Sequence, residues 1–159
     1  MITISQSMKH EVTSISVTAT IREAAALFVE KHIGTLPVLD KDGRLVGTLH
    51  IHDLLELVMP SFTRLVEDFD FVRGNFSIFE TMLPPPEVAI QPVKSVMDPP
   101  VSVKANSGLL RAFAIMNNHH MYDVPVVDDD DLLVGLASRV DIGTALLAGW
   151  RSASAEGAN

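Results

Sequence analysis

The sequence predicts a mixed α/β (α+β) fold made of two similar β-α-β-β-α units. Two observations support this fold: a duplicated stretch, and the same change from strand-like to helix-like periodicity in each copy. The copies LPVLDKDGRLVGTLHIHDLL, from Leu36, and VPVVDDDDLLVGLASRVDIG, from Val124, align without a gap. Since a three-stranded sheet cannot cover both of its faces alone, we expect the units to pack around a shared core with pseudo-twofold symmetry.

The first unit opens with a short strand at residues 15–17 and a helix that Thr20 begins. Glu23 lies three residues after Thr20, a capping-box spacing that satisfies free N–H groups at a helix start. The apolar residues of this helix have helical spacing and predict one buried stripe: Ile21, Ala24, Leu27 and Phe28.

A hairpin follows, with strands at residues 36–40 and 45–51. Its turn, DKDGR, contains Gly43, which tolerates a positive φ. A second helix is expected from about Asp53 to Val58 and ends at Pro60. The second copy predicts the same order of elements, with its hairpin turn in the sequence DDDD.

The chain divides into four segments. Residues 1–59 and 95–148 form the two units, residues 60–94 a connector, and residues 149–159 a flexible tail. Flexible linkers are poor in aromatic residues. Five of the seven phenylalanines lie in the connector, so we expect it to be partly helical and packed on the core or on a partner: Phe62, Phe69, Phe71, Phe76 and Phe79.

Composition excludes several classes of protein. The 159 residues include 20 acidic and 12 basic side chains, and this excess of negative charge argues against binding a nucleic acid. The absence of cysteine excludes disulfides and thiolate metal sites. No apolar run approaches the roughly 18 residues of a membrane span, and the first residues lack a signal-peptide pattern, so we expect no membrane partner and a cytoplasmic location.

The paired units resemble a tandem of CBS domains (cystathionine-β-synthase domains), often called a Bateman module. The resemblance covers about residues 8–58 and 95–148 and rests on a hydrophobic-Pro-Val-hydrophobic-Asp strand, a turn, a strand with a central glycine, and an aspartate just inside a helix. It implies two clefts between the units and adenosine-containing ligands such as AMP, ADP, ATP or S-adenosylmethionine. It also implies dimerisation through helices and a signal passed to an effector protein.

Ser138 and Asp141 match the Ser/Thr-x-x-Asp motif of this family. A carboxylate at a helix start can accept hydrogen bonds from both ribose hydroxyls, and the serine can face the same cleft. The helix N-terminus favours an anion, so Arg139 is expected to contact phosphate. The adenine is expected against a wall made of Val101, Val103, Met121 and Tyr122. In the alternative interpretation, Asp141 only caps the helix and Ser138 is a turn hydroxyl.

The first unit departs from the motif, because His50 replaces the hydroxyl residue. Asp53 remains available for a ribose and Thr35 for a hydrogen bond to phosphate, but we expect this to be the weaker cleft. In the second unit Asp123 lies where many family members carry a basic residue, and it repels polyphosphate unless Arg139, Lys104 or a metal neutralises it. These departures favour AMP, an adenosine-like molecule or S-adenosylmethionine over ATP.

The remaining groups of polar residues do not indicate a metal site or a catalytic site. His50 and His52 alternate at a predicted strand end and should point to opposite faces, so we expect no metal site. No P-loop, GxGxxG or nucleophile motif is present, so we expect no enzyme and no required cofactor.

We therefore predict a regulatory adenosine-ligand module that is homodimeric and acts on an unknown effector. The expected dimer contacts are apolar helix faces: Leu54, Leu57 and Val58, and Ile142 and Leu146. The alternative is a constitutive dimerisation or interaction module whose clefts are empty or degenerate.

Overall fold

The computed structural model describes residues 2–59 and 83–156, with side chains up to residue 151. The five phenylalanines of the predicted connector, and most of that connector, lie outside the described residues. None of the described helices is both long and apolar enough to cross a membrane.

Two copies of a β-α-β-β-α unit form the molecule, which confirms the predicted fold class and order of elements. The expected shared core is wrong, because each unit has a core cluster of its own. The first contains β1 (Ile15–Ser16), α1 (Ile21–Lys31), β2 (Thr35–Leu39), β3 (Leu45–His50) and α2 (Ile51–Glu56). The second contains β4 (Val103–Lys104), α5 (Leu109–Asn118), β5 (Asp123–Val127), β6 (Leu133–Ser138) and α6 (Arg139–Glu156). In each sheet the middle strand pairs parallel with the first strand and antiparallel with the third.

The predicted capping box starts α1. The Glu23 backbone N–H donates to Thr20 Oγ1 at 3.2 Å, and the Thr20 backbone N–H donates to Glu23 Oε2 at 2.6 Å. Two of the N–H groups that a helix start leaves free are therefore satisfied. The helix buries the face that carries Ile21, Ala24 and Phe28.

Both hairpin turns contain a residue with a left-handed backbone conformation (positive φ) at the same position of the repeat. Gly43 has a φ of 83°, as predicted, and Asp131, 88 positions later, has a φ of 63°. Aspartate is one of the few residues that tolerate this region without a glycine. The repeat therefore preserves the turn geometry although the residue differs.

The helices that follow the hairpins differ from the prediction at their ends. The helix α2 begins at Ile51, two residues before the predicted start, with His50 as its N-cap. The helix α6 runs for 18 residues to Glu156, so it continues into the segment predicted as a flexible tail. Alanine-rich sequence without proline favours this continuation, and the two glycines of α6, Gly143 and Gly149, weaken the helix without ending it.

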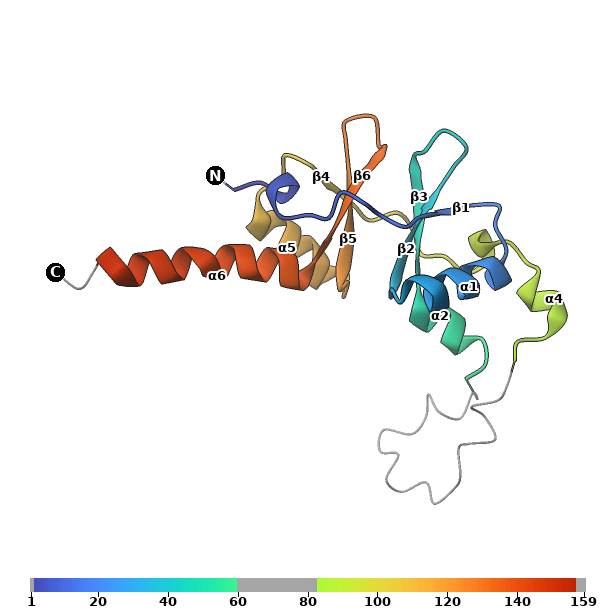
Figure 1. Ribbon diagram of the computed structural model, residues 1–159. Coiled ribbons are helices and arrows are strands. Elements are labelled where there is room, and N and C mark those ends of the chain that lie inside the picture. The colour runs from blue at the N-terminus through green and yellow to red at the C-terminus, as the bar shows by residue number, and fades with distance from the viewer. Residues whose placement is uncertain (1, 60–82, 157–159) are drawn as a thin grey trace, which may run out of the picture.

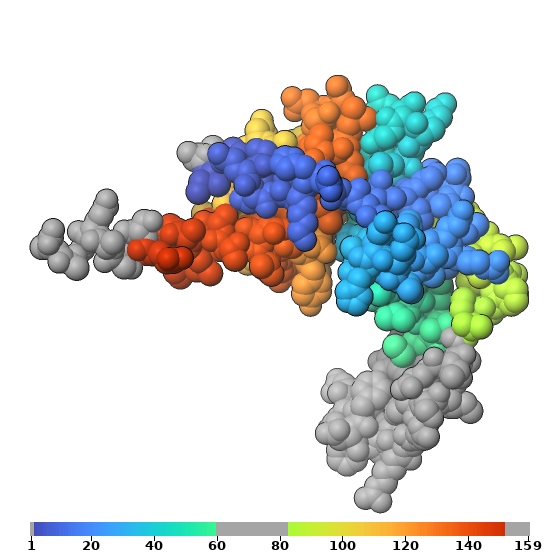
Figure 2. Space-filling model, in the orientation of Figure 1, coloured from blue at the N-terminus to red at the C-terminus, as the bar shows by residue number. Residues whose placement is uncertain are grey.

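Each unit is completed by a segment from elsewhere in the chain. Ile4, in the single turn η1 (Ile4–Gln6), is fully buried in the core of the second unit. Val93, in the turn η4 (Val93–Ser95), is fully buried in the core of the first unit, beside the short helix α4 (Pro86–Ala89). In Figure 2 the dark blue N-terminal segment lies over the orange and red second unit. The core of each unit therefore includes a residue from outside its own β-α-β-β-α stretch.

The two units meet along the pseudo-twofold axis. The hairpins stand side by side with their turns on the same side of the molecule, and the helices of each unit lie on opposite flanks (Figure 1). Near the turns, the Leu45 backbone N–H donates to the Asp131 carbonyl at 3.1 Å. At the other end of the hairpins, Thr35 Oγ1 donates to Asp123 Oδ2 at 2.8 Å. Thr35 and Asp123 are equivalent positions of the repeat, so the axis passes between them.

Candidate ligand-binding clefts

A hollow with several polar side chains lies between the two units on the side of His50. Two adjoining hollows, of about 430 and 340 Å³, share His50, Asp98, His119 and Met121. We call their union the histidine cleft. Its remaining lining residues are Gly34, Thr35, Thr48, Ile51, His52, Pro99, Val101, His120, Tyr122 and Asp123.

A second cleft of about 270 Å³ lies on the other side of the pseudo-twofold axis. It is lined by Lys9, Glu11, Val12, Thr13, His32, Ile33, Gly34, Thr35, Asp123 and Leu136. His32 here corresponds to His120 in the histidine cleft, and both have a left-handed backbone, with φ of 52° and 54°. The two clefts are therefore unequal copies of one site.

Each cleft combines the hairpin end of one unit with the loop before the hairpin of the other unit. Val101 and Met121 consequently line the cleft of His50 and not that of Ser138, which corrects the grouping predicted from the sequence. Val103 is only 3% exposed and belongs to the second core, so it lines neither cleft. Tyr122 is 76% exposed at the rim of the histidine cleft.

His50 connects several polar groups of the histidine cleft. Its Nδ1 lies 3.4 Å from Thr35 Oγ1, and its Nε2 lies 3.7 Å from Asp98 Oδ2. Burial lowers the pKa of His50, and this effect outweighs the opposing attraction of the nearby carboxylates. The imidazole is therefore neutral at neutral pH and presents one donor and one acceptor.

Thr48 carries an unsatisfied hydroxyl in the wall of the histidine cleft. The residue is 1% exposed, and its Oγ1 has no hydrogen-bond partner among the described residues. Leaving a buried hydroxyl unpaired costs roughly 1–3 kcal/mol. A polar group of a bound molecule would remove this cost. Thr48 was not expected as a site residue, because threonine is common in strands.

Asp53 caps the helix that leads away from the cleft. Its Oδ2 accepts a hydrogen bond from the His50 backbone N–H at 2.6 Å, and its Oδ1 lies 3.1 Å from His52 Nε2. The rings of His50 and His52 are stacked, with centroids 5.2 Å apart and planes 6° apart. The prediction that these histidines point to opposite faces is wrong, because α2 begins at Ile51 and ends the alternation of the strand.

Ser138 and Asp141 form the equivalent corner of the second unit. The Ser138 backbone N–H and Oγ donate to Asp141 Oδ2 at 2.8 and 2.7 Å, and the Asp141 backbone N–H donates to Ser138 Oγ at 3.0 Å. These bonds form a capping box at the start of α6, in which Ser138 precedes the helix and Asp141 is its third residue, so the two residues have the opposite places from those in the alternative interpretation. Ser138 pairs with Asp123 in the sheet and so adjoins the second cleft. A role for either side chain toward ribose stays a prediction.

The basic residues considered as neutralising groups have other partners. Arg139 Nε donates to the Met121 carbonyl at 2.7 Å, and its guanidinium lies 5.2 Å from the centre of the Tyr122 ring. Arg139 is thus held at the rim of the histidine cleft. Lys104 Nζ contacts Asp131 at 2.8 Å in the hairpin turn, so it is directed away from Asp123.

The predicted dimer faces differ in their accessibility. Leu54, Leu57 and Val58 line an apolar hollow of about 430 Å³ beside α1 and α4. Leu146 lines the corresponding hollow, of about 530 Å³, beside α5. Ile142 is fully buried in the second core, which removes it from the predicted contact surface.

Comparison with known proteins identifies related chains. The model of the CBS domain family matches residues 3–60 and 93–148. CBSX1, a chloroplastic CBS domain-containing protein of Arabidopsis thaliana, is 31% identical over 150 residues, which cover 91% of this chain. The uncharacterised protein MJ1232 of Methanocaldococcus jannaschii is 30% identical over 133 residues, which cover 83% of this chain. The matches span 63% and 35% of the length of these relatives.

Solved structures share the fold. The crystal structure of CBSX2 in complex with AMP has a TM-score of 0.69 and 24% identity, and the match covers 93% of this chain and 98% of that chain. The CBS domain pair of MJ0100, in complex with 5′-methylthioadenosine and S-adenosyl-L-methionine, has a TM-score of 0.67 and 18% identity. That match covers 94% of this chain and 98% of the other.

Proposed function

Because the chain belongs to the CBS domain family, as a tandem pair, we propose that it is a regulatory module that binds an adenosine-type ligand in the histidine cleft. CBS pairs are typically regulatory and not catalytic, and no enzymatic family is indicated by the matches. The observation that carries the choice of cleft is the buried, unpaired hydroxyl of Thr48.

The histidine cleft has the chemistry that an adenosine needs. Val101 and Met121 supply apolar surface for the base beside the Thr48 hydroxyl, and neutral His50 adds a donor and an acceptor. The hollows are of the size of small-molecule sites, about 300–1,000 Å³. The two solved CBS pairs described above hold AMP, and 5′-methylthioadenosine with S-adenosylmethionine, which supports this class of ligand.

The charged side chains of the histidine cleft favour some adenosine ligands over others. Asp98 and Asp123 line the cleft and repel a polyphosphate, while Arg139 is the cation at its rim. Among AMP, ADP, ATP and S-adenosylmethionine, we therefore expect AMP and S-adenosylmethionine to bind more tightly than ATP.

The second cleft is a weaker candidate in this proposal. It is smaller, and the carboxylate of Asp141 already accepts two hydrogen bonds from Ser138. This order reverses the preference predicted from the sequence, which favoured the Ser138 and Asp141 corner because of its motif.

Regulation would act through the contact between the units. A ligand that touches both Thr48 and Met121 bridges the two halves and favours the arrangement in which they fit it best. An effector protein that binds this arrangement would then respond to the ligand concentration. We propose that the module acts as a homodimer, since both helix pairs carry exposed apolar residues such as Leu55, Leu110 and Leu147.

Calorimetric titration with AMP, S-adenosylmethionine and ATP tests the proposal. Thr48→Val keeps the shape of the side chain and removes the hydroxyl, so it should weaken AMP binding roughly fivefold while leaving the ligand-free protein as stable or more stable. Thr13→Val is the matched control in the second cleft and should leave binding unchanged. Loss of binding in Thr13→Val but not in Thr48→Val would assign the ligand to the second cleft.

The alternative function is constitutive dimerisation or interaction through the helix faces. The two apolar hollows at equivalent places of the two units favour it. Light scattering of the ligand-free protein measures the dimer directly. A stable dimer that binds none of the three adenosine compounds would support this alternative over the ligand-binding role.

A further inference from the structure

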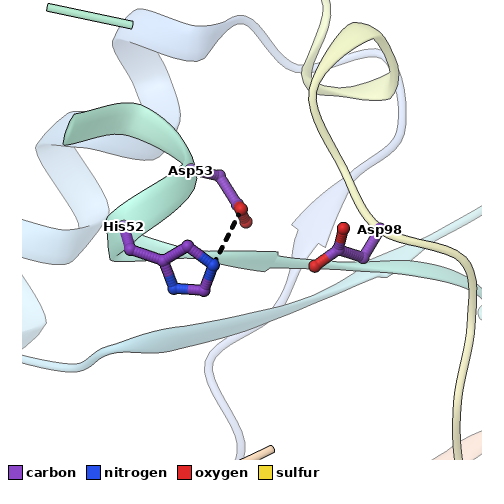
Figure 3. A group of neighbouring side chains, drawn as sticks. All are labelled: His52, Asp53 and Asp98. Atoms are coloured by element: carbon purple, nitrogen blue, oxygen red, sulfur yellow. Dashed lines mark ion pairs between the residues drawn. The ribbon is translucent and has the colours of Figure 1, made fainter. Parts of the chain in front are cut away.

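We propose that His52, Asp53 and Asp98 form a binding site for a divalent transition metal ion at the edge of the histidine cleft. Figure 3 shows the three side chains converging, with His52 and Asp53 joined by an ion pair and Asp98 facing them from another segment. One ligand atom from each residue lies within 4.8 Å of the others. The site does not depend on the adenosine ligand proposed above.

The distances suit a metal after a small closure. Ligand atoms about 2.0–2.1 Å from a tetrahedral Zn²⁺ lie roughly 3.3 Å apart. His52 Nε2 and Asp53 Oδ1 are already 3.1 Å apart. The side chains of His52 and Asp98 are 65% and 55% exposed, so they are free to close the remaining gap.

Hydrogen bonds outside the cluster position the ligands. Asp53 uses Oδ2 for the His50 backbone N–H, which leaves Oδ1 directed at the site. Asp98 is fixed through its backbone, which exchanges two hydrogen bonds with Thr48 at 3.1 and 2.9 Å. His50 Nε2 lies 3.7 Å from the carboxylate of Asp98. Supporting contacts of this kind orient metal ligands in known sites.

Charge balance also favours a dication. Among the described residues, the basic partners of the Asp53 and Asp98 carboxylates are histidines, and His50, which lies beside Asp98, is neutral. A divalent cation would compensate both carboxylates at once.

The donor set indicates the class of metal. One imidazole and two carboxylates suit Zn²⁺ and neighbouring first-row metals better than Ca²⁺ or Mg²⁺, which take oxygen ligands. Three protein ligands leave a fourth position open to water or to a ligand in the cleft. The repeat supplies an internal comparison, because the equivalent corner has Val140 in place of His52 and therefore lacks the imidazole.

Calorimetric titration of chelator-treated protein with Zn²⁺, in the absence of nucleotide, tests the site. We expect one ion per chain, and His52→Ala and Asp98→Ala should each weaken binding at least tenfold, the lower end of the loss seen even for supporting residues. Asp53→Asn keeps a carbonyl acceptor for the helix cap and should weaken binding similarly. The matched controls are His10→Ala and Asp130→Ala, which replace exposed residues outside the cluster and should bind as the unmodified protein does.

Spectroscopy of the Co²⁺ form gives a second readout that does not depend on stability. Visible absorption of four-coordinate or five-coordinate Co²⁺ should appear in the unmodified protein and disappear in His52→Ala. Equal Zn²⁺ affinity in the unmodified protein and the His52→Ala/Asp98→Ala double variant would overturn the proposal. Loss of binding only in His119→Ala/His120→Ala would also overturn it, because the ligands would then be the other histidines of the cleft. Neither result bears on AMP binding.

Discussion

The N-terminal segment, which crosses from the first unit to pack in the core of the second unit, provides the most direct test of the fold. Ile4 lies 99 to 138 positions before the other buried residues of the second core, yet it is fully buried among them. Ile4→Ala removes three buried carbon atoms, worth about 2.4 kcal/mol at ~0.8 kcal/mol each, and leaves a cavity that adds to the loss. We therefore expect the free energy of unfolding to fall by about 3 kcal/mol, which corresponds to about 6–12 °C in Tm for a domain of this size.

Urea unfolding followed by circular dichroism measures this loss. Ile2→Ala is the matched control, because Ile2 is also an isoleucine, lies two positions before Ile4 and is 52% exposed. It should change stability by less than about 0.5 kcal/mol. Hydrogen exchange should show the lost protection in the second unit, around α5 and β5, and not around α1 and β2. Equal stability of the two variants, or a loss confined to the first unit, would refute the crossed packing.

Three further predictions concern glycines and a helix cap. Gly143→Ala should stabilise the protein by about 0.5–1 kcal/mol in chemical unfolding, because Gly143 lies inside α6 and an added Cβ has no atom within 4 Å. Gly47→Ala should destabilise it by about 1–3 kcal/mol in the same assay, because the added Cβ would lie 2.9 Å from the backbone oxygen of Asp98. The backbone and side-chain hydrogen bonds from Thr20 lower the pKa of Glu23, so its contribution to stability is complete above the unfolded pKa of about 4.3 and is lost as the pH falls through the lower folded value. Tm measured from pH 6 to pH 3 should therefore fall less steeply in Glu23→Gln, and identical profiles would contradict this cause.

The repeat made most of the fold predictable. Because Gly47 and Gly135, and Asp53 and Asp141, recur at one offset, strand order and hairpin turns could be read from local residues. The capping box of α1 was equally local, and the structure contains it. Such features depend on residues within a few positions of one another, which is the range over which sequence patterns carry information.

The composition of the clefts could not be read in the same way. Met121 was expected beside Ser138 because both belong to the second copy, whereas the pseudo-twofold axis places Met121 beside His50 of the first copy. The crossed segments were missed for a related reason: Ile4 and Val93 are 89 positions apart and not 88, so they fall out of the register that revealed the repeat. Contacts across the axis depend on packing, and no local pattern encodes them.

The grouping of His52, Asp53 and Asp98 was not expected from the sequence because of a helix boundary. Strand alternation separates His50 from His52, but a helix that starts two residues earlier brings their rings together and turns His52 toward Asp53. The start of a helix depends on which residue can act as its N-cap. With His50 as the N-cap, Asp53 is the third helical residue and its carboxylate accepts a hydrogen bond from the His50 backbone N–H, which favours this start. A shift of two residues at one boundary thus changed which side chains meet.

The exchange of segments between the units also determines when each core can close during synthesis. As the chain leaves the ribosome, the first core lacks Val93 until well after its strands have emerged. The second core, in which Ile4 is buried, is complete only when Ile142 has been synthesised. Each core therefore depends on a segment that lies outside its own β-α-β-β-α stretch. Such long-range closure slows folding and favours a single cooperative transition over the stepwise folding of two independent domains.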